Sequence, residues 1–254
     1  MSADAYLQQI LNREAVDTGI FSPVRAVQAA LEPAIRQWAN RFLIGVSASG
    51  SFAKGTANRS GTDIDLFISL SSETRETLKE IYESLFTRMQ EIGYTPKRQN
   101  VSINIRVGAY DVDLVPGKHQ GYPGDDHSLY RRRADTWTKT NVRTHIDHVV
   151  AANWLSETRI LKLWRNQKGL EFPSFYLELA VIKALAPGFY KSGLAADVWK
   201  VFQYLGADFS SARIQDPANT NNVISDDLSA AERTAIRAAA TRALQAKTWG
   251  EIVV

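Results

Sequence analysis

The sequence contains no cysteine, only four histidines and only two methionines. A chain without cysteine has no disulfide and no thiolate ligand, and four scattered histidines argue against a zinc site. We therefore expect any metal ion to be held by oxygen ligands.

Long apolar runs are also missing. No stretch approaches the roughly 20 apolar residues that a membrane-spanning helix requires. The N-terminus also lacks a basic segment followed by an apolar run, which a secretory signal would have. Both absences predict a cytoplasmic protein with no membrane partner.

Charge of either sign is nearly balanced, since 30 Lys and Arg against 27 Asp and Glu give a net charge of +3. This mild basic bias suits polyanionic substrates, but it is far from the excess expected of a protein that coats nucleic acid. The 254 residues are enough for one large domain or two smaller ones.

The first 115 residues mix helical and strand-like patterns. Apolar residues at helical spacing predict a leading helix that begins at Pro23, and a second helix between Ser72 and Ile92 with Ser72 as its cap. Four β-rich segments are predicted strands: residues 42–46, 63–70, 101–107 and 110–115. Gly108-Ala109 separates the last two as in a two-residue hairpin, so the sheet should be mixed.

Residues 116–135 are rich in Gly, Pro, Asp, His and Arg, which predicts a long connecting loop. The remaining chain is helical in pattern, with predicted helices at 141–153, 156–168, 174–185, 193–205 and 229–246. The sequence therefore predicts an α+β fold with a catalytic lobe at 1–135 and a helical, nucleotide-binding lobe at 136–254. We expect the substrate to lie in the groove between them.

Carboxylates are the first candidate for chemistry. Asp63 and Asp65 lie two residues apart on a predicted strand, so both side chains leave the same face. Asp113 joins them if its strand is adjacent. Three such carboxylates repel one another, and Mg²⁺, which prefers oxygen ligands, would keep all three ionised. Two ions roughly 4 Å apart, with Mn²⁺ as a substitute, would favour phosphoryl or nucleotidyl transfer.

A glycine turn precedes these carboxylates. Residues 49–56, with Gly50 and Ser51 at their centre, follow a predicted strand and can aim backbone N–H groups and the Ser51 hydroxyl at a phosphate. The alternative is an ordinary turn between a strand and a helix.

The ordered combination of these motifs resembles the DNA polymerase β-type nucleotidyltransferases. The segments that carry the resemblance are Gly50-Ser51, Asp63-Ile64-Asp65, residues 112–116, residues 159–164, residues 173–178 and residues 216–223. The helical segments are similar to those of the bacterial cGAS/DncV-like cyclic-oligonucleotide synthases (CD-NTases), the oligoadenylate synthases and the archaeal-type CCA-adding enzymes.

The resemblance implies a polymerase β-like lobe and a helical lobe with the active site in the cleft, nucleoside triphosphate (ATP or GTP) as substrate, Mg²⁺ as cofactor and pyrophosphate as product. It implies that Gly50 and Ser51 hold the β- and γ-phosphates. It also implies that Asp63, Asp65 and Asp113 bind metal, with Asp111 as a fallback for Asp113.

Further residues resemble nucleotide contacts. Lys162 resembles the lysine that contacts the triphosphate in these families; otherwise it is a surface lysine on an amphipathic helix. Tyr176 could stack on the base, and Ser174 could contact the base or cap the helix; otherwise Tyr176 is a core aromatic residue. The cluster 131–133 is three arginines that could attract a triphosphate or an acceptor strand, or simply face solvent.

Three functions follow from the resemblance. The first is a synthase of a cyclic di- or oligonucleotide messenger in antiphage signalling, which the short chain favours because it should end soon after the helical lobe. The second is a CCA-adding enzyme acting on tRNA or another RNA, although the net charge is low for a large phosphate footprint. The third is an inactive nucleotide-binding pseudoenzyme.

Overall fold

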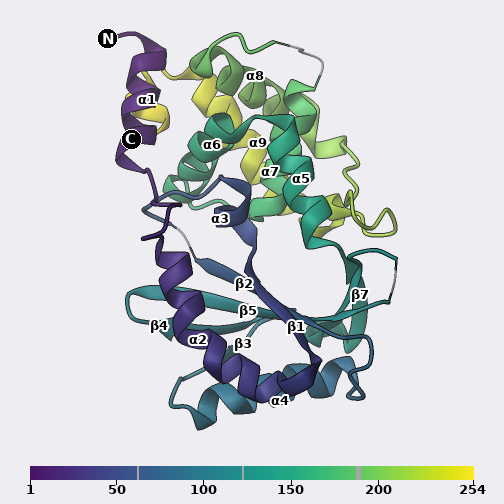
Figure 1. Cartoon of the computed structure of the whole chain (residues 1–254). Coiled ribbons are helices and arrows are strands. Elements are labelled where there is room, and N and C mark those ends of the chain that lie inside the picture. Colours follow the sequence, from purple (N-terminus) through teal and green to yellow (C-terminus); the bar gives the residue numbers. More distant parts are fainter. Residues whose placement is uncertain (62, 122, 187–189) are drawn as a thin grey trace. The chain divides into compact units, whose positions relative to one another are not determined.

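In the computed structural model, which describes residues 1–61, 63–121, 123–186 and 190–254, the chain forms two compact units (Figure 1). Unit 1 contains residues 1–16, 55–61 and 147–254, and unit 2 contains residues 17–54 and 62–146. This division differs from the predicted boundary at residue 135. The N-terminal residues and the short segment 55–61 belong with the helical half.

Unit 2 is built on a mixed sheet, as the sequence predicts. Its strands are β1 (Leu43–Ala48), β2 (Ile64–Leu70), β3 (Lys97–Arg98), β4 (Ile103–Val107), β5 (Tyr110–His119), β6 (His127–Arg131) and β7 (Thr136–Thr140). The order is β1-β2-β5-β4-β3, and β6 joins β5 to β7. The pair β2 and β5 is parallel, whereas the other pairs are antiparallel.

Helices α2 (Pro23–Ala39) and α4 (Leu78–Glu91) bury their apolar faces with the sheet in one core. Alternate residues of β2, including Ile64 and Leu66, are completely buried in this core. The residues between them face the other side of the sheet because side chains alternate along a strand. One face of β2 is thus structural, and its opposite face carries Asp65.

The predicted start of α4 at Ser72 is wrong. Thr77 is the N-cap, its hydroxyl accepts a hydrogen bond from the Glu80 backbone, and the Glu80 carboxylate accepts one from the Thr77 backbone. This reciprocal capping box satisfies two backbone donors at once, so it defines where the helix begins.

The predicted loop at 116–135 is also wrong. Within it, β5 continues to His119, β6 spans His127–Arg131, and a 3₁₀ turn, η2, covers Arg132–Ala134. Gly117 is a packing residue, because a Cβ atom there would lie 2.6 Å from the Phe67 ring. Composition predicted a loop where close packing against an aromatic ring requires glycine.

Unit 1 is helical, as predicted. It contains α1 (Ala3–Arg13), α6 (Leu155–Gln167), α7 (Ser174–Leu185), α8 (Leu194–Ala207), α9 (Ala230–Gln245) and α10 (Trp249–Ile252), and α5 (Val142–Ala152) extends into it from unit 2. Two further 3₁₀ turns are η3 (Phe209–Ser211) and η4 (Ile224–Asp227), and a third, η1 (Asn40–Phe42), lies in unit 2. Unit 2 also contains the short helix α3 (Gly50–Lys54), which follows β1. The core of unit 1 is aromatic, with Trp164, Tyr176, Phe202 and Phe209 all fully buried.

Helix α1 and the short α10 were missed by the sequence reasoning, and α1 contributes Leu7, Ile10 and Leu11 to this core. In the described part of the chain, none of the helices combines the length and the apolar character that crossing a membrane requires.

Candidate functional site

Gly50 lies directly against Asp65 in unit 2. Its φ is +58°, and a Cβ atom built on it would lie 1.8 Å from Asp65 Oδ2. The backbone N–H of Ser49 donates to the Asp65 carbonyl at 2.8 Å, which ties the turn to β2. Only glycine fits this conformation and this space. The predicted phosphate turn and a predicted metal ligand are therefore in contact.

The two strands that carry the carboxylates are adjacent. In the parallel pairing of β2 with β5, Asp65 is the direct partner of Asp113. Neighbouring strands lie about 4.8 Å apart, so two carboxylates are held side by side on one face. Asp63, the residue before β2, is exposed. The sequence analysis assigned Asp113 to the site only if its strand is adjacent to that of Asp65, and the structure shows that the two strands are adjacent.

The carboxylates influence one another's protonation. The pKa of Asp113 is raised, first by burial and then by the negative charge of Asp63, against the lowering effect of its hydrogen bond from Asn104. Although Asp63 is exposed as a residue, its carboxyl group is partly desolvated, and this desolvation, followed by the negative charge of Asp111, raises its pKa. A cation would relieve this repulsion and favour the ionised forms.

Asp113 is also oriented by amides that the sequence reasoning missed. Asn104 Nδ2 donates to Asp113 Oδ1 at 2.9 Å, and Gln99 Nε2 donates to the same oxygen at 3.1 Å. A signal for Asn104 existed, because the predicted hairpin pairs Val107 with Tyr110 and so places Asn104 opposite Asp113. Gln99 lies outside that pairing.

Asp111, the fallback, has a different partner. Its carboxylate accepts a hydrogen bond from Arg106 at 2.8 Å on the same hairpin. This ion pair favours Asp113 over Asp111 as the third carboxylate, which is also the order of preference that the resemblance implies.

Among the described residues, no three Asp, Glu, His or Cys side chains lie together in a group that could hold a metal ion. The chemistry of the donors nevertheless fits Mg²⁺: the candidates are all carboxylates, and two of them have a pKa raised by burial and by neighbouring negative charge. Asp63, Asp65 and Asp113 would hold such an ion.

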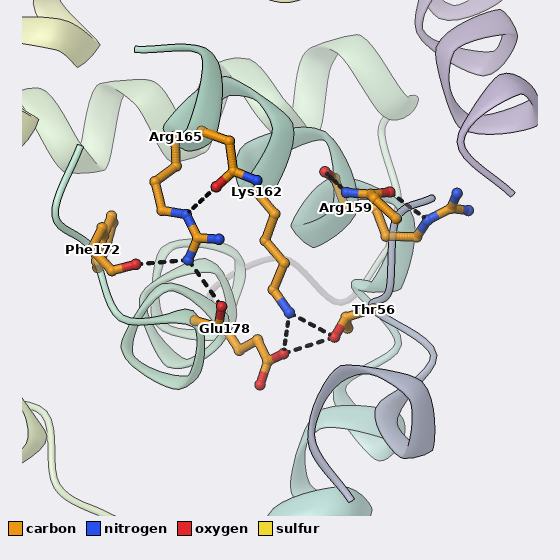
Figure 2. Close-up of polar contacts among 9 residues, drawn as sticks. Thr56, Arg159, Lys162, Arg165, Phe172 and Glu178 are labelled. Atoms are coloured by element: carbon orange, nitrogen blue, oxygen red, sulfur yellow. Dashed lines mark hydrogen bonds and ion pairs between the residues drawn. The ribbon is translucent and has the colours of Figure 1, made fainter. Parts of the chain in front are cut away.

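In unit 1, Lys162 belongs to a buried cluster with Thr56 and Glu178 (Figure 2). Lys162 Nζ donates to Glu178 Oε1 at 2.6 Å and to Thr56 Oγ1 at 2.9 Å. Thr56 Oγ1 in turn donates to Glu178 Oε1 at 2.7 Å. Lys162 is thus an interior ammonium paired with a carboxylate, and the surface-lysine interpretation is wrong.

Residues 33–161 match the profile of a family described as a nucleotidyltransferase domain. The chain belongs to this family. The match includes Gly50, Ser51 and all three candidate carboxylates.

A curated relative of this nucleotidyltransferase is a cyclic AMP-AMP-AMP synthase of Escherichia coli (strain MS 115-1), with 27% identity over 176 residues. The match covers 62% of this chain and 55% of the relative. The chain spans about half the length of the curated relatives that it matches.

Solved structures show the fold. E. coli MS115-1 CdnC with ATP aligns at a TM-score of 0.79 with 22% identity, covering 95% of this chain and 90% of CdnC. The Bradyrhizobium diazoefficiens CD-NTase CdnG in complex with GTP aligns at a TM-score of 0.75 with 13% identity, again covering 95% and 90%. The nucleotidyltransferase therefore has the polymerase β-like fold of the CD-NTases, as predicted.

The aromatic residue expected to stack on a base lies inside the core. The Tyr176 ring is fully buried, with its centroid 5.3 Å from that of Phe172 and 5.2 Å from that of Phe209. As it stands, Tyr176 offers no face to a base. Its neighbour Phe175 is partly exposed in the first turn of α7, so Phe175 is the better candidate.

Ser174 begins α7, and Arg165 holds it there. Arg165 Nη1 donates to Ser174 Oγ at 2.9 Å. It also donates to the Phe172 carbonyl at 2.8 Å (Figure 2). The predicted capping role is not observed, because Pro173 occupies the N-cap position and makes no side-chain cap. Base contact by Ser174 stays a prediction.

The arginine cluster 131–133 is partly structural. Arg132 Nε donates to the Gln99 carbonyl at 3.1 Å, and Gln99 in turn donates to Asp113. Arg132 and Arg133 are exposed. Arg132 therefore holds the backbone of Gln99, whose side chain orients Asp113, and the attraction of the cluster for a triphosphate stays a prediction.

Proposed function

We propose that this nucleotidyltransferase joins nucleoside triphosphates into a cyclic di- or oligonucleotide messenger, with Mg²⁺ as cofactor and pyrophosphate as the released product. ATP is the first substrate to test, because the curated relative is a cyclic AMP-AMP-AMP synthase. The proposed biological role is antiphage signalling, which the resemblance of the sequence motifs to the cyclic-oligonucleotide synthases implies.

The observation that carries the proposal is the contact between Gly50 and Asp65, with Asp113 as the strand partner of Asp65. The turn at the start of α3 is tied to β2 through the Ser49 backbone, and the two carboxylates lie on the paired strands β2 and β5. Polymerase-type transfer needs both a grip on the phosphates and acidic metal ligands.

Each residue has a proposed task. Gly50 and Ser51 bind the β- and γ-phosphates through backbone N–H groups and the Ser51 hydroxyl. Asp63, Asp65 and Asp113 hold Mg²⁺, which when bound neutralises phosphate charge and makes an attacking hydroxyl more acidic. Asn104 and Gln99 fix the Asp113 carboxylate in the orientation that the site needs.

The nucleotide also needs contacts remote from the reacting phosphate. We propose that Lys162 supplies positive charge for the triphosphate and that Ser174 and Phe175 contact the base. An aromatic face binds any base, so ATP and GTP are both candidates. Tyr176 would support Phe175 from the core rather than contact the base itself.

The experiment incubates the purified chain with Mg²⁺ and each labelled nucleoside triphosphate, alone and mixed, with and without tRNA, and resolves the products after phosphatase treatment. The proposal predicts small, phosphatase-resistant products without RNA. Label found only on tRNA would instead indicate a CCA-adding enzyme. Nucleotide binding without any product would indicate a pseudoenzyme, and both of these outcomes contradict the proposal.

A further inference from the structure

The segment Gly55–Gly61, here called the connecting segment, forms neither helix nor strand, yet its middle residues 56–58 are buried while its two ends are exposed. Thr56, Ala57 and Asn58 have exposed fractions of 0%, 3% and 5%. Connecting segments usually run over the surface, because a buried one must find partners for its backbone and polar groups. The burial of its middle residues in unit 1 therefore calls for an explanation.

Several elements of unit 1 hold this segment. Arg159 Nε donates to Asn58 Oδ1 at 3.0 Å, and Asn58 Nδ2 donates to the Arg159 carbonyl at 2.9 Å. Glu14 accepts hydrogen bonds from the backbone of Arg59 at 3.0 Å and of Ser60 at 2.8 Å. The segment is fixed from both α6 and the end of α1.

The most unusual anchor is the charge cluster at Thr56. The side chains of Lys162 and Glu178 are 6% and 1% exposed, and together with Thr56 they form a closed triangle of hydrogen bonds. Taking two charges out of water is expensive, and a packed apolar pair would often serve stability equally well. A purely structural anchor for the segment would not need this pair.

Helix α6 arranges its cations in one row. Arg159, Lys162 and Arg165 follow one another at intervals of three residues, so they lie along one face of the helix (Figure 2). In order, they bond Asn58, then Thr56 with Glu178, and then the start of α7. One helix face thus links the connecting segment to the residues proposed to read the base.

The connecting segment has a special place in the chain. Gly55 follows Lys54, the last residue of α3, and Gly61 lies two residues before Asp63. Its ends therefore continue directly into the phosphate turn and the first carboxylate. A shift of Thr56 would be transmitted through the backbone to Lys54 and the phosphate turn.

We propose that Thr56 and Glu178 are positioning residues, which couple the Lys162 ammonium to the connecting segment and so set the phosphate turn for transfer. This inference rests on the proposed function. Neither residue needs to contact the nucleotide. When the negatively charged triphosphate comes near the Lys162 ammonium, the ammonium acts on the connecting segment through its hydrogen bond with the Thr56 hydroxyl.

Two substitutions at one position separate hydroxyl from shape. Thr56→Val keeps the shape and removes the hydroxyl, whereas Thr56→Ser keeps the hydroxyl and removes a methyl group. We expect Thr56→Val to lower kcat roughly tenfold or more while KM stays within about threefold, because a small misplacement of reacting groups acts on kcat. Thr56→Ser should retain kcat within about threefold.

Glu178→Gln should lower kcat in the same way, and the double variant with Thr56→Val should be no worse than the less active single variant, because the two residues act as a unit. Glu157→Gln is the matched control. Glu157 is equally buried, lies in the same unit and pairs with Lys191 at 3.4 Å, yet it is not part of the cluster.

A second measurement does not depend on turnover. Hydrogen–deuterium exchange of the nucleotide-free proteins should be faster in residues 50–61 and 63–70 for Thr56→Val and Glu178→Gln than for Thr56→Ser and Glu157→Gln. Absence of product from the wild-type chain would count against the proposed function, while this exchange pattern would still support the coupling. The inference is overturned if Thr56→Val matches Thr56→Ser in exchange, or in kcat where product forms.

Discussion

At the scale of single residues, Gly50 is the most constrained position of the site. Its positive φ and its contact with Asp65 leave no room for a side chain, since a Cβ atom would overlap the carboxylate. Gly45, on β1, has open space where a Cβ atom would lie, with nothing within 4 Å, and its φ is not positive. Gly45 is therefore a suitable control position for a substitution at Gly50.

Gly50→Ala should lower kcat by roughly 100-fold or more, because the added carbon must displace Asp65 or the turn. Gly45→Ala should stay within about threefold of wild type. Steady-state kinetics with ATP, with circular dichroism to check the fold, measures both. Equal activity of the two variants would refute the assignment of Gly50.

The amides around Asp113 make a prediction about pH. The Asn104 hydrogen bond lowers the pKa of Asp113, which burial raises. Asn104→Leu should therefore raise that pKa further, so that Asp113 becomes protonated at a higher pH as the solution is acidified. The acid limb of the kcat/KM profile should move to higher pH than in wild type.

A matched control for this shift is Lys97→Ala, since Lys97 is the exposed strand partner of Asn104 on β3. Its acid limb should coincide with that of the wild type. An unmoved limb in Asn104→Leu would mean that protonation of Asp113 in the free enzyme does not set the acid limb of kcat/KM.

Sequence reasoning reached the carboxylates and the glycine turn because alternation along a strand places side chains on one face without any tertiary information. It did not anticipate that Tyr176 is fully buried and Phe175 partly exposed. Both are aromatic residues at a helix start, and only the packing of Phe172 and Phe209 decides which ring enters the core.

At the scale of elements, the sequence predicts the helices that have strong apolar periodicity. For α4, however, the predicted first residue is wrong. Ser72 and Thr77 are both good caps by residue type. Thr77 is the N-cap because Glu80 lies three residues later and completes the capping box. The spacing signal was present in the sequence.

Thr77→Ala should lower the free energy of unfolding by about 1 kcal/mol, because one backbone donor of α4 loses its partner. Ser72→Ala should change it by less than about 0.5 kcal/mol, since Ser72 is exposed outside the helix. Chemical denaturation of both variants measures the difference. A larger loss for Ser72→Ala would restore the earlier start of the helix.

The strands after Pro116 show that amino-acid composition alone does not predict every strand. Gly, Pro and Asp predict loops, yet here Gly117 accommodates the Phe67 ring and β6 and β7 pair along five residues each. Strand pairing comes from partners distant in sequence, so a single sequence carries little trace of it.

At the scale of the whole molecule, the α+β class and the family were predicted because the motifs occur in a fixed order along the chain. The exact division was not, since residues 1–16 and 55–61 pack with the helical unit. The segment 55–61 belongs to unit 1 while the chain on either side of it belongs to unit 2. Nothing in the composition of these seven residues predicts this. The predicted groove for substrate stays a prediction.

The central claim is nucleotidyl transfer at Asp65 and Asp113, and one assay tests it directly. ATP labelled at the α-phosphate is incubated with Mg²⁺ and wild type, Asp65→Asn, Asp63→Asn or Gly45→Ala, and the phosphatase-resistant product is counted. We predict product from wild type and Gly45→Ala and a loss of roughly a thousandfold in folded Asp65→Asn and Asp63→Asn. Undiminished product from Asp65→Asn would contradict the account.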